Sequence, residues 1–373
     1  MKKKNILTFA NPLLDFQEDK EEILSVITSV LESGNYLIGP FLSKFEREFA
    51  LYNGSRFAVG VNSGTDALRL ALLSLGVGAN DEVIVPSHTA VATVSAIVSI
   101  GAIPVFADIN SDDFTLDITS VTKLISKSTK AVVAVHIYGK SCEMEGLVNL
   151  CKSHKLKLVE DCAQSAGGNF RGRKLGSIGD IGCFSFYPTK NIGAFGDAGA
   201  IITNEERIFS KLLSLRQYGW DKKRISKIPS TVSRLDEIQA AVLSVKLKKL
   251  DDNNERRISN ATAYYQELEN IAEIKIPHLS KNKEHVFHLY VIQTEKRKKL
   301  IKAMEKFGII PGIHYPTPVH QQPAFVQYFD RKAEKLETTE FLCNRILTLP
   351  MYPQLTFEEI HRVTGVINSV YSR

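Results

Sequence analysis

Short apolar segments alternate with helical patterns along the chain between Phe57 and Thr203. The apolar segments are Phe57–Val61, Val83–Pro86, Pro104–Ala107, Ala131–Ile137, Leu156–Val159, Cys183–Phe186 and Ala200–Thr203. The helical patterns lie near Thr65–Leu75, Ala90–Ser99, Ile118–Ser126 and Met144–His154. Strands that alternate with helices predict an α/β fold with a mostly parallel central sheet, covered by helices on both faces.

The pattern changes after a second strong helix. An amphipathic helix is predicted at Glu21–Ser33, and a longer one at Arg234–Lys249. The densely charged segment Asp251–Arg257 follows, and beyond it an extended apolar run occupies Val286–Ile292. We therefore expect a large domain over residues 1–250 and a smaller C-terminal α+β domain over residues 251–373.

Composition narrows the class of protein. The 373 residues are 44% hydrophobic and 24% charged, with a formal net charge of +6. This charge suits a phosphorylated small molecule but is too mild and dispersed to indicate nucleic acid. No run is apolar enough to span a membrane, and no secretory segment follows Lys2 to Lys4, so we expect a cytoplasmic protein. Five cysteines without a C-x-x-C pair argue against a disulfide framework or a zinc ribbon.

A lysine follows one of the predicted strands in an unusual setting. The segment Phe184–Asn191 leads from the strand through Pro188 to Lys190. The glycine-rich segment Gly193–Gly199 comes next and precedes a strand, whereas a dinucleotide-binding fingerprint precedes a helix. A lone lysine in a loop is normally a solvated charge, but one between apolar runs in a glycine-lined turn suits a nucleophilic amine that forms a Schiff base.

Two other predicted strands end in polar residues. Val159 is followed by Glu160 and Asp161, at the carboxyl end of a strand, where functional residues of parallel sheets gather. A carboxylate there can keep the pyridine nitrogen of pyridoxal phosphate (PLP) protonated, although a turn or helix cap is the commoner role of such a residue. The segment Asn62–Leu68 turns from strand to helix, where backbone N–H groups can bind a phosphate or simply be capped.

Taken in order, these segments resemble the DegT/DnrJ/StrS family of PLP-dependent nucleotide-sugar aminotransferases, within the aspartate-aminotransferase-like group called fold type I. The resemblance covers nearly the whole chain. The segments that carry it are Tyr36–Pro40, Asn62–Leu68, Pro86–Thr89, Glu160–Gln164, Ser185–Asn191, Gly196–Gly199, Ser233–Gln239, His314–Pro316 with His320, and Leu349–Met351.

The resemblance implies roles for matching positions. Lys190 would hold PLP as a Schiff base and shuttle the proton, and Asp161 would pair with the ring nitrogen. Gln164 would contact the ring hydroxyl, and His88 would lie over the ring. Other cofactor-binding positions would be Gly64, Thr65 and Ser185 at the phosphate, together with Asn191. The sugar pocket would use Tyr187, His314, Tyr315 and His320, for which ordinary packing is an equal alternative.

The sequence also departs from the family pattern. Val232 stands where the family usually has an asparagine that reaches the partner subunit's phosphate site. Ala166 and Tyr352 stand where histidine is common. A few members that dehydrate a sugar have histidine in place of the lysine, so Lys190 disfavours that reaction. A non-catalytic PLP-binding regulator is a further alternative, disfavoured by the intact set of Lys190, Asp161 and Gln164.

The resemblance is greatest to aminotransferases that act on dTDP-3-keto-6-deoxyhexoses. Pro86-Ser87-His88-Thr89 and the Gly193–Asp197 segment favour this substrate, with a dTDP- or UDP-linked 4-keto sugar as the alternative. The resemblance further implies glutamate as amino donor, a homodimer, and a place in amino-sugar, O-antigen or glycan biosynthesis. The sugar configuration is not readable from the sequence.

Overall fold

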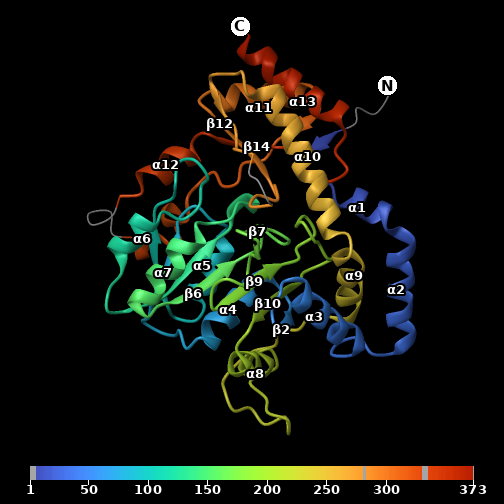
Figure 1. Ribbon diagram of the computed structural model, residues 1–373, viewed down its shortest axis with the longest axis vertical. Helices are drawn as coiled ribbons and strands as arrows, with labels where there is room; N and C mark the ends of the chain where they lie inside the picture. Colours follow the sequence, from blue (N-terminus) through green and yellow to red (C-terminus); the bar gives the residue numbers. More distant parts are fainter. Residues whose placement is uncertain (1–5, 280–282, 330–334, 373) are drawn as a thin grey trace.

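A seven-stranded sheet lies at the centre of the larger part of the structure (Figure 1). The computed structural model describes residues 6–279, 283–329 and 335–372, so Lys2 to Lys4 lie outside the described residues. β10 is antiparallel to both of its neighbours, and all other neighbouring strands are parallel. This confirms the expected mostly parallel α/β sheet. Its order is β2 (Phe57–Val61), β10 (Gly199–Thr203), β9 (Ile181–Ser185), β6 (Lys157–Asp161), β5 (Thr129–Val135), β3 (Glu82–Pro86) and β4 (Ile103–Ala107).

Each strand of this sheet corresponds to one of the predicted apolar segments. The strands read as continuous apolar runs because helices cover both faces, and all five residues of β10 are buried. The segment predicted to reach Ile137 ends as a strand at Val135 instead. His136 leaves the extended conformation there, and a short 3₁₀ turn, η1 (Ile137–Gly139), follows.

Helices pack on the two faces of the sheet in separate groups. One face packs against α4 (Gly64–Ser74), α5 (Val91–Val98) and α8 (Glu206–Leu215). The opposite face packs against α6 (Ile118–Leu124) and α7 (Met144–His154) at one side, and against α3 (Pro40–Tyr52) and α9 (Glu237–Leu247) at the other. α1 (Pro12–Glu18) and α2 (Lys20–Ser33) lie outside α9 (Figure 1). The hairpin β7 (Asn169–Phe170) and β8 (Arg173–Lys174) is separate from the sheet.

The helix predicted at Arg234–Lys249 is shorter than expected. Arg234 precedes the helix, and Asp236 is an extended N-cap residue with a ψ of 151°. The Glu237 carboxylate that follows accepts hydrogen bonds from the N–H groups of Gly39, Phe41 and Leu42. It thereby satisfies donors at the start of α3, which have no backbone acceptor within that helix. The start of α9 is set by this long-range contact, which periodicity does not show.

The C-terminal part has its own core and a three-stranded antiparallel sheet. Asp251–Arg257, predicted as a boundary, lies inside a helix that starts at Leu250. Leu7, from the N-terminal strand, is buried in this second core because its strand pairs with Ile309–Ile310. The division at residue 250 stays a proposal. The elements are β1 (Leu7–Thr8), α10 (Leu250–Leu268), β11 (Ile274–Lys275), β12 (Tyr290–Thr294), α11 (Arg297–Lys306), β13 (Ile309–Ile310), η2 (Val319–Gln321), η3 (Val326–Tyr328), α12 (Glu337–Cys343), β14 (Ile346–Leu349) and α13 (Phe357–Tyr371).

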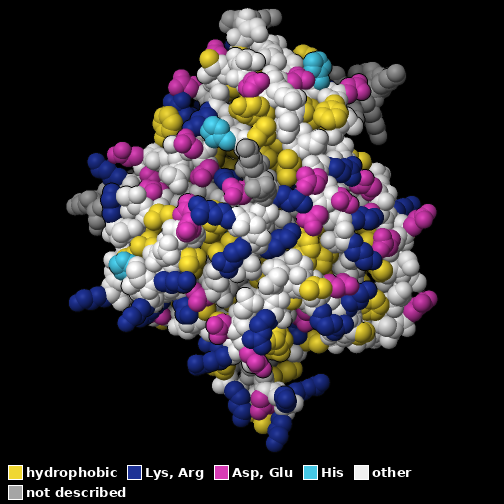
Figure 2. All heavy atoms as spheres, in the orientation of Figure 1, with side chains coloured by type: hydrophobic (Ala, Val, Ile, Leu, Met, Phe, Trp, Pro, Cys, Tyr) yellow, Lys and Arg dark blue, Asp and Glu magenta, His cyan; other side chains and the backbone are white. Residues whose placement is uncertain are grey.

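The face drawn in Figure 2 carries side chains of both charges. Figure 2 shows Lys and Arg side chains interspersed with Asp and Glu over most of this face, whereas Lys and Arg predominate on the projection below α8. This dispersion agrees with the small net charge of +6. Within the described ranges, no helix combines the length and hydropathy required to cross a bilayer.

Candidate active site

The carboxyl ends of several central strands surround a cavity of about 400 Å³. β6 ends at Asp161 and β9 ends at Ser185, while Ser63 and Gly64 directly follow β2. Strand ends meet at one edge of a parallel sheet, which brings these distant segments together. Of the predicted site residues, the cavity is lined by Gly64, Thr65, Asp161, Gln164, Ser185, Tyr187, Lys190, His314 and Tyr315.

A tight turn presents Lys190 to this cavity. The backbone N–H of Lys190 donates to the Tyr187 carbonyl at 2.9 Å. The backbone then folds back, and the Ala194 N–H donates to the Phe186 carbonyl at 2.7 Å. A Cβ on Gly193 would lie 2.5 Å from Pro188 O, so only glycine permits this close return. Burial lowers the pKa of Lys190 to about 8, and the charge of Asp161 partly opposes the shift. A neutral, nucleophilic amine is therefore accessible near neutral pH.

Two donors hold the Asp161 carboxylate in place. Thr93 Oγ1 donates to Oδ2 at 2.9 Å, and Ala163 N–H donates to Oδ1 at 3.1 Å. Burial raises the pKa of Asp161, while these hydrogen bonds and the charge of Lys190 oppose the rise. The carboxylate is thus fixed in an apolar surrounding where a cationic partner on a ligand would gain most.

Gln164 is fixed at both ends of its amide. Its Oε1 accepts the Tyr138 N–H at 2.6 Å, and its Nε2 donates to the Tyr315 hydroxyl at 3.1 Å. The carbonyl end is thus committed to the backbone, and the amino end lies on the cavity side with Tyr315. This orientation leaves an N–H able to donate to an oxygen on a bound ring.

The start of α4 forms a cradle that suits a phosphate. Ser63 caps the helix by accepting the Asp66 N–H at 3.2 Å. Among the described residues, the N–H groups of Gly64 and Thr65 have no backbone or side-chain acceptor, and both residues begin the helix beside the cavity. A Cβ on Gly64 would lie 2.6 Å from the Ser185 Cβ, so glycine keeps the cradle open next to the Ser185 hydroxyl. Backbone donors and the helix dipole together favour an anion there.

These features fit PLP. The cradle supplies phosphate donors, Asp161 supplies an anion for the pyridine nitrogen, and Lys190 supplies the amine for the aldehyde. Gln164 offers a donor to the ring hydroxyl. The donor set therefore matches the charges and polar groups of the cofactor around its whole edge.

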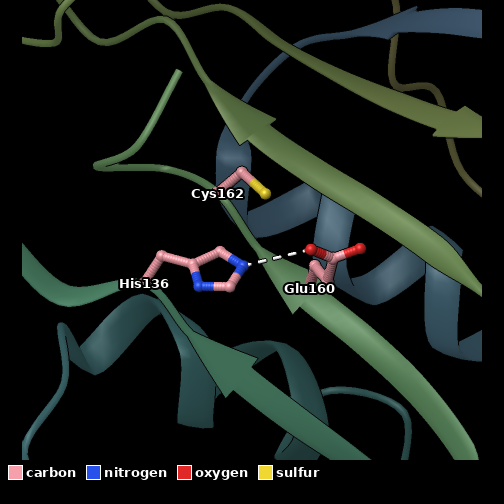
Figure 3. A group of neighbouring side chains, drawn as sticks. All are labelled: His136, Glu160 and Cys162. Atoms are coloured by element: carbon pink, nitrogen blue, oxygen red, sulfur yellow. Dashed lines mark hydrogen bonds and ion pairs between the residues drawn. The ribbon is translucent and has the colours of Figure 1, made fainter. Parts of the chain in front are cut away.

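A buried trio of His136, Glu160 and Cys162 has the composition of a metal site (Figure 3). The Glu160 oxygens, however, accept the N–H groups of Gly176, Ile178 and Gly179, and His136 Nε2 lies 3.2 Å from Oε2. His136 Nδ1 accepts the Cys142 N–H at 3.1 Å. These lone pairs are engaged in holding neighbouring loops, so His136 and Glu160 have a structural role here.

Three predicted site residues do not line the cavity. His88 is 1% exposed and lies behind the lining residues, where its ring packs edge-on near Tyr138 and Tyr315. His320 is fully buried and links Ser87 to Glu340, so the structure does not place it at the sugar pocket. The Asn191 side chain turns away toward α10. In each case neighbouring polar groups supply the hydrogen-bond partners of the side chain, and the cofactor and sugar contacts expected for these three residues stay predictions.

Periodicity and motif reasoning missed other residues that shape the site. Thr93 holds Asp161, Tyr138 holds Gln164, and His288 lines the cavity with its Nδ1 3.0 Å from Asn191 Oδ1. Asn191 donates its amide hydrogens to Asn254 and Val286 O, so its oxygen accepts from His288. Thr93 and His288 lie within helical and apolar patterns that give no signal of a polar role.

Comparison with known proteins identifies the family of the chain. The model of the DegT/DnrJ/EryC1/StrS aminotransferase family matches residues 17–368. The chain is 41% identical to a dTDP-3-amino-3,4,6-trideoxy-alpha-D-glucose transaminase of Streptomyces venezuelae, over 95% of each chain. It is 39% identical to a dTDP-3-amino-3,6-dideoxy-alpha-D-galactopyranose transaminase of Aneurinibacillus thermoaerophilus, over 96% of this chain and 98% of the relative.

A solved structure of S. venezuelae DesV, in complex with a ketimine intermediate, superposes with a TM-score of 0.95. That protein is 40% identical, and the match covers 99% of both chains. Sequence and fold thus agree over nearly the whole length, and the chain belongs to the DegT/DnrJ/EryC1/StrS aminotransferase family.

Proposed function

We propose that this PLP-dependent aminotransferase moves an amino group from glutamate to C-3 of a dTDP-linked 3-keto-6-deoxyhexose. Two relatives named for dTDP-3-amino sugars match at about 40% identity along nearly the whole chain, and this observation carries the choice of carbon. One of them is a glucose derivative and the other a galactose derivative, so the sugar configuration stays open.

Different residues of the cavity have different roles in amino transfer. Bound PLP supplies an aldehyde for the amine and a ring that withdraws electrons from the reacting carbon. Lys190, with a pKa near 8, can release and recover a proton at its Nζ at neutral pH. Asp161 provides the fixed negative charge that keeps the ring nitrogen protonated. Gln164 orients the ring through its amide.

The proposed sugar pocket uses Tyr187, His314 and Tyr315, which all line the cavity. Burial lowers the pKa of His314 to about 4, so its imidazole is neutral at physiological pH. Its Nδ1 lies 2.9 Å from Thr348 Oγ1. Neutral hydroxyl and imidazole groups suit an uncharged hexose, which needs hydrogen bonds and shape more than charge.

The working unit in this proposal is a symmetric homodimer. Tyr187 lines the cavity yet is 53% exposed, and Val232 is 39% exposed. Ser233 Oγ, adjacent to Val232, bonds the Asn62 side chain, which places this segment near the phosphate cradle. A two-fold partner covering these apolar side chains would complete the wall of each cavity. Sedimentation should show a dimer at assay concentration, and an active monomer would refute this part.

A direct assay tests the choice of substrate. The purified enzyme, PLP and glutamate are incubated separately with the dTDP-3-keto and dTDP-4-keto 6-deoxyhexoses, and kcat/KM is compared. We expect the 3-keto sugar to be preferred by at least tenfold. Preference for the 4-keto sugar, or for a UDP-linked sugar in a matched assay, would assign the alternative substrate.

A further inference from the structure

Tyr138 lies behind the cavity wall and contacts it through both its backbone and its hydroxyl. Its N–H donates to Gln164 Oε1 at 2.6 Å, and its hydroxyl donates to the His314 carbonyl. Gln164 Nε2 in turn donates to Tyr315, the residue after His314. The contacts form a closed ring that starts and ends at Tyr138. Tyr138 is 3% exposed and is not among the residues lining the active-site cavity.

The hydroxyl of Tyr138 also fixes the state of His88. A phenol has one hydrogen, and a carbonyl can only accept, so the Tyr138 hydrogen belongs to His314 O. His88 Nε2, at 2.5 Å from the same hydroxyl, must then be the donor. His88 Nδ1 is left as an acceptor and lies 3.3 Å from Cys343 Sγ. The hydrogen bonds therefore run in one direction, from the Cys343 thiol through His88 and Tyr138 to the His314 carbonyl.

The three hydrogen-bonded side chains of Cys343, His88 and Tyr138 are uncharged over a wide pH range. Burial lowers the pKa of His88 to about 4 and raises that of Cys343 to about 12. The pKa of Tyr138 is raised well above its ordinary value by burial. The donors and acceptors are consequently the same at any pH at which the enzyme would be assayed.

The local backbone is shaped for this contact. Tyr138 has a φ of 60°, in the left-handed region that side chains seldom occupy. This conformation lets its N–H face Gln164 while its carbonyl accepts the Leu289 N–H at 3.2 Å. Unusual backbone conformations persist where surrounding contacts hold them, often beside functional sites.

We propose that Cys343, His88 and Tyr138 form a positioning chain that holds the His314–Tyr315 wall and thereby sets the orientation of the keto sugar. This inference rests on the proposed function. It gives His88 an indirect role through the wall in place of a contact over the ring. Because a displacement of about 1 Å can cost a hundredfold in rate, a loosened wall should impair the sugar reaction more than the glutamate reaction.

The variant Tyr138→Phe tests the positioning chain by removing a single hydroxyl group. It keeps the backbone bond to Gln164 and removes only the hydroxyl that reaches His314 and His88. Tyr371→Phe is the matched control, because its hydroxyl pairs with Thr294 in the C-terminal core. We expect kcat/KM of the sugar half-reaction to fall at least tenfold in Tyr138→Phe, with the glutamate half-reaction within twofold of wild type. Calorimetry should show at least fivefold weaker binding of the dTDP-amino sugar product.

Equal losses in both half-reactions, or no loss in either, would overturn the proposal. If Tyr138→Phe folds poorly, Cys343→Ala and Cys343→Ser provide a second test. Serine keeps a donor to His88 Nδ1, so it should stay within twofold of wild type while alanine loses several-fold on the sugar.

A measurement without substrate separates this inference from the proposed function. Nitrogen-15 NMR of the His88 imidazole, assigned by comparison with His88→Gln, should show the hydrogen on Nε2. A hydrogen on Nδ1 would contradict the proposed positioning chain, whichever sugar the enzyme aminates. Failure of the wild type on every 3-keto nucleotide sugar would instead contradict the proposed function.

Discussion

Replacing Asp161 with asparagine separates the charge at this position from its shape. The side chains have nearly equal volume, and Thr93 Oγ1 lies 2.9 Å from both Asp161 Oδ2 and Thr89 Oγ1. The Thr93 hydroxyl can therefore turn toward Thr89 and accept from the new amide, while the Ala163 N–H keeps an oxygen acceptor. We expect Asp161→Asn to fold and to lose only the negative charge.

The size of the catalytic loss follows from that charge. A hydrogen bond to a charged group is worth about 1.5–3 kcal/mol, and a contact pair of charges at a partly screened site about 4 kcal/mol. A net loss of about 3–5 kcal/mol in transition-state stabilisation corresponds to roughly 150-fold to several thousandfold in rate. The assay is the single-turnover reaction of the PLP-loaded enzyme with glutamate, followed by absorbance, with Asp180→Asn as the control outside the cavity.

The same variant should not weaken the apoprotein. Burial raises the pKa of Asp161 above its ordinary value of 3.8, so the folded apoprotein loses stability as pH rises through the folded-state pKa. Removing the charge removes this penalty, and the apoprotein melting temperature at pH 7 should equal or exceed that of wild type. A rate within fivefold of wild type would show that another group faces the ring nitrogen, and a large drop in melting temperature would show that the loss was structural.

Three further predictions concern the lysine and the phosphate cradle. Lys190→Ala should abolish turnover while leaving the circular dichroism spectrum unchanged, and normal turnover would exclude Lys190 as the reacting amine. Because burial lowers the pKa of Lys190 to about 8, the rate of PLP capture by the apoprotein should rise through an inflection near pH 8. The stability of the apoprotein should rise between about pH 8 and the ordinary lysine pKa of 10.5. An inflection of the capture rate near pH 10.5 would contradict the lowered pKa of Lys190. Gly64→Ala should weaken PLP binding at least tenfold in a fluorescence titration and lower stability by about 1–3 kcal/mol, since the new Cβ would meet Ser185 at 2.6 Å, and unchanged binding would place the phosphate elsewhere.

The sheet was predictable because its strands carry a local signal. Segments such as Ala200–Ile202 are apolar throughout, which is what burial on both faces requires. Asp161 and Ser185 could be placed at one edge because parallel strands end together. The start of α9 at Glu237 could not be predicted, since it depends on contacts with Gly39 and Leu42 far along the sequence.

Contacts between residues distant in sequence also explain which features of the site could not be predicted. Motif resemblance predicted His88 over the cofactor ring and His320 at the sugar pocket, but the hydrogen-bond partners of each side chain decide which way it faces. His88 turns to Tyr138 and Cys343, and His320 turns to Ser87 and Glu340. Tyr138 gave no signal because its role depends on a backbone conformation and on Gln164 and His314, which are distant in sequence.

Transfer of labelled nitrogen tests the central claim most directly. The enzyme is incubated with [15N]glutamate and a dTDP-3-keto-6-deoxyhexose labelled uniformly with carbon-13, and the product is examined by NMR. The account predicts a one-bond coupling between nitrogen-15 and C-3 of the sugar, lost in Lys190→Ala. Nitrogen bonded to C-4, or no incorporation of nitrogen by the PLP-loaded wild type, would contradict it.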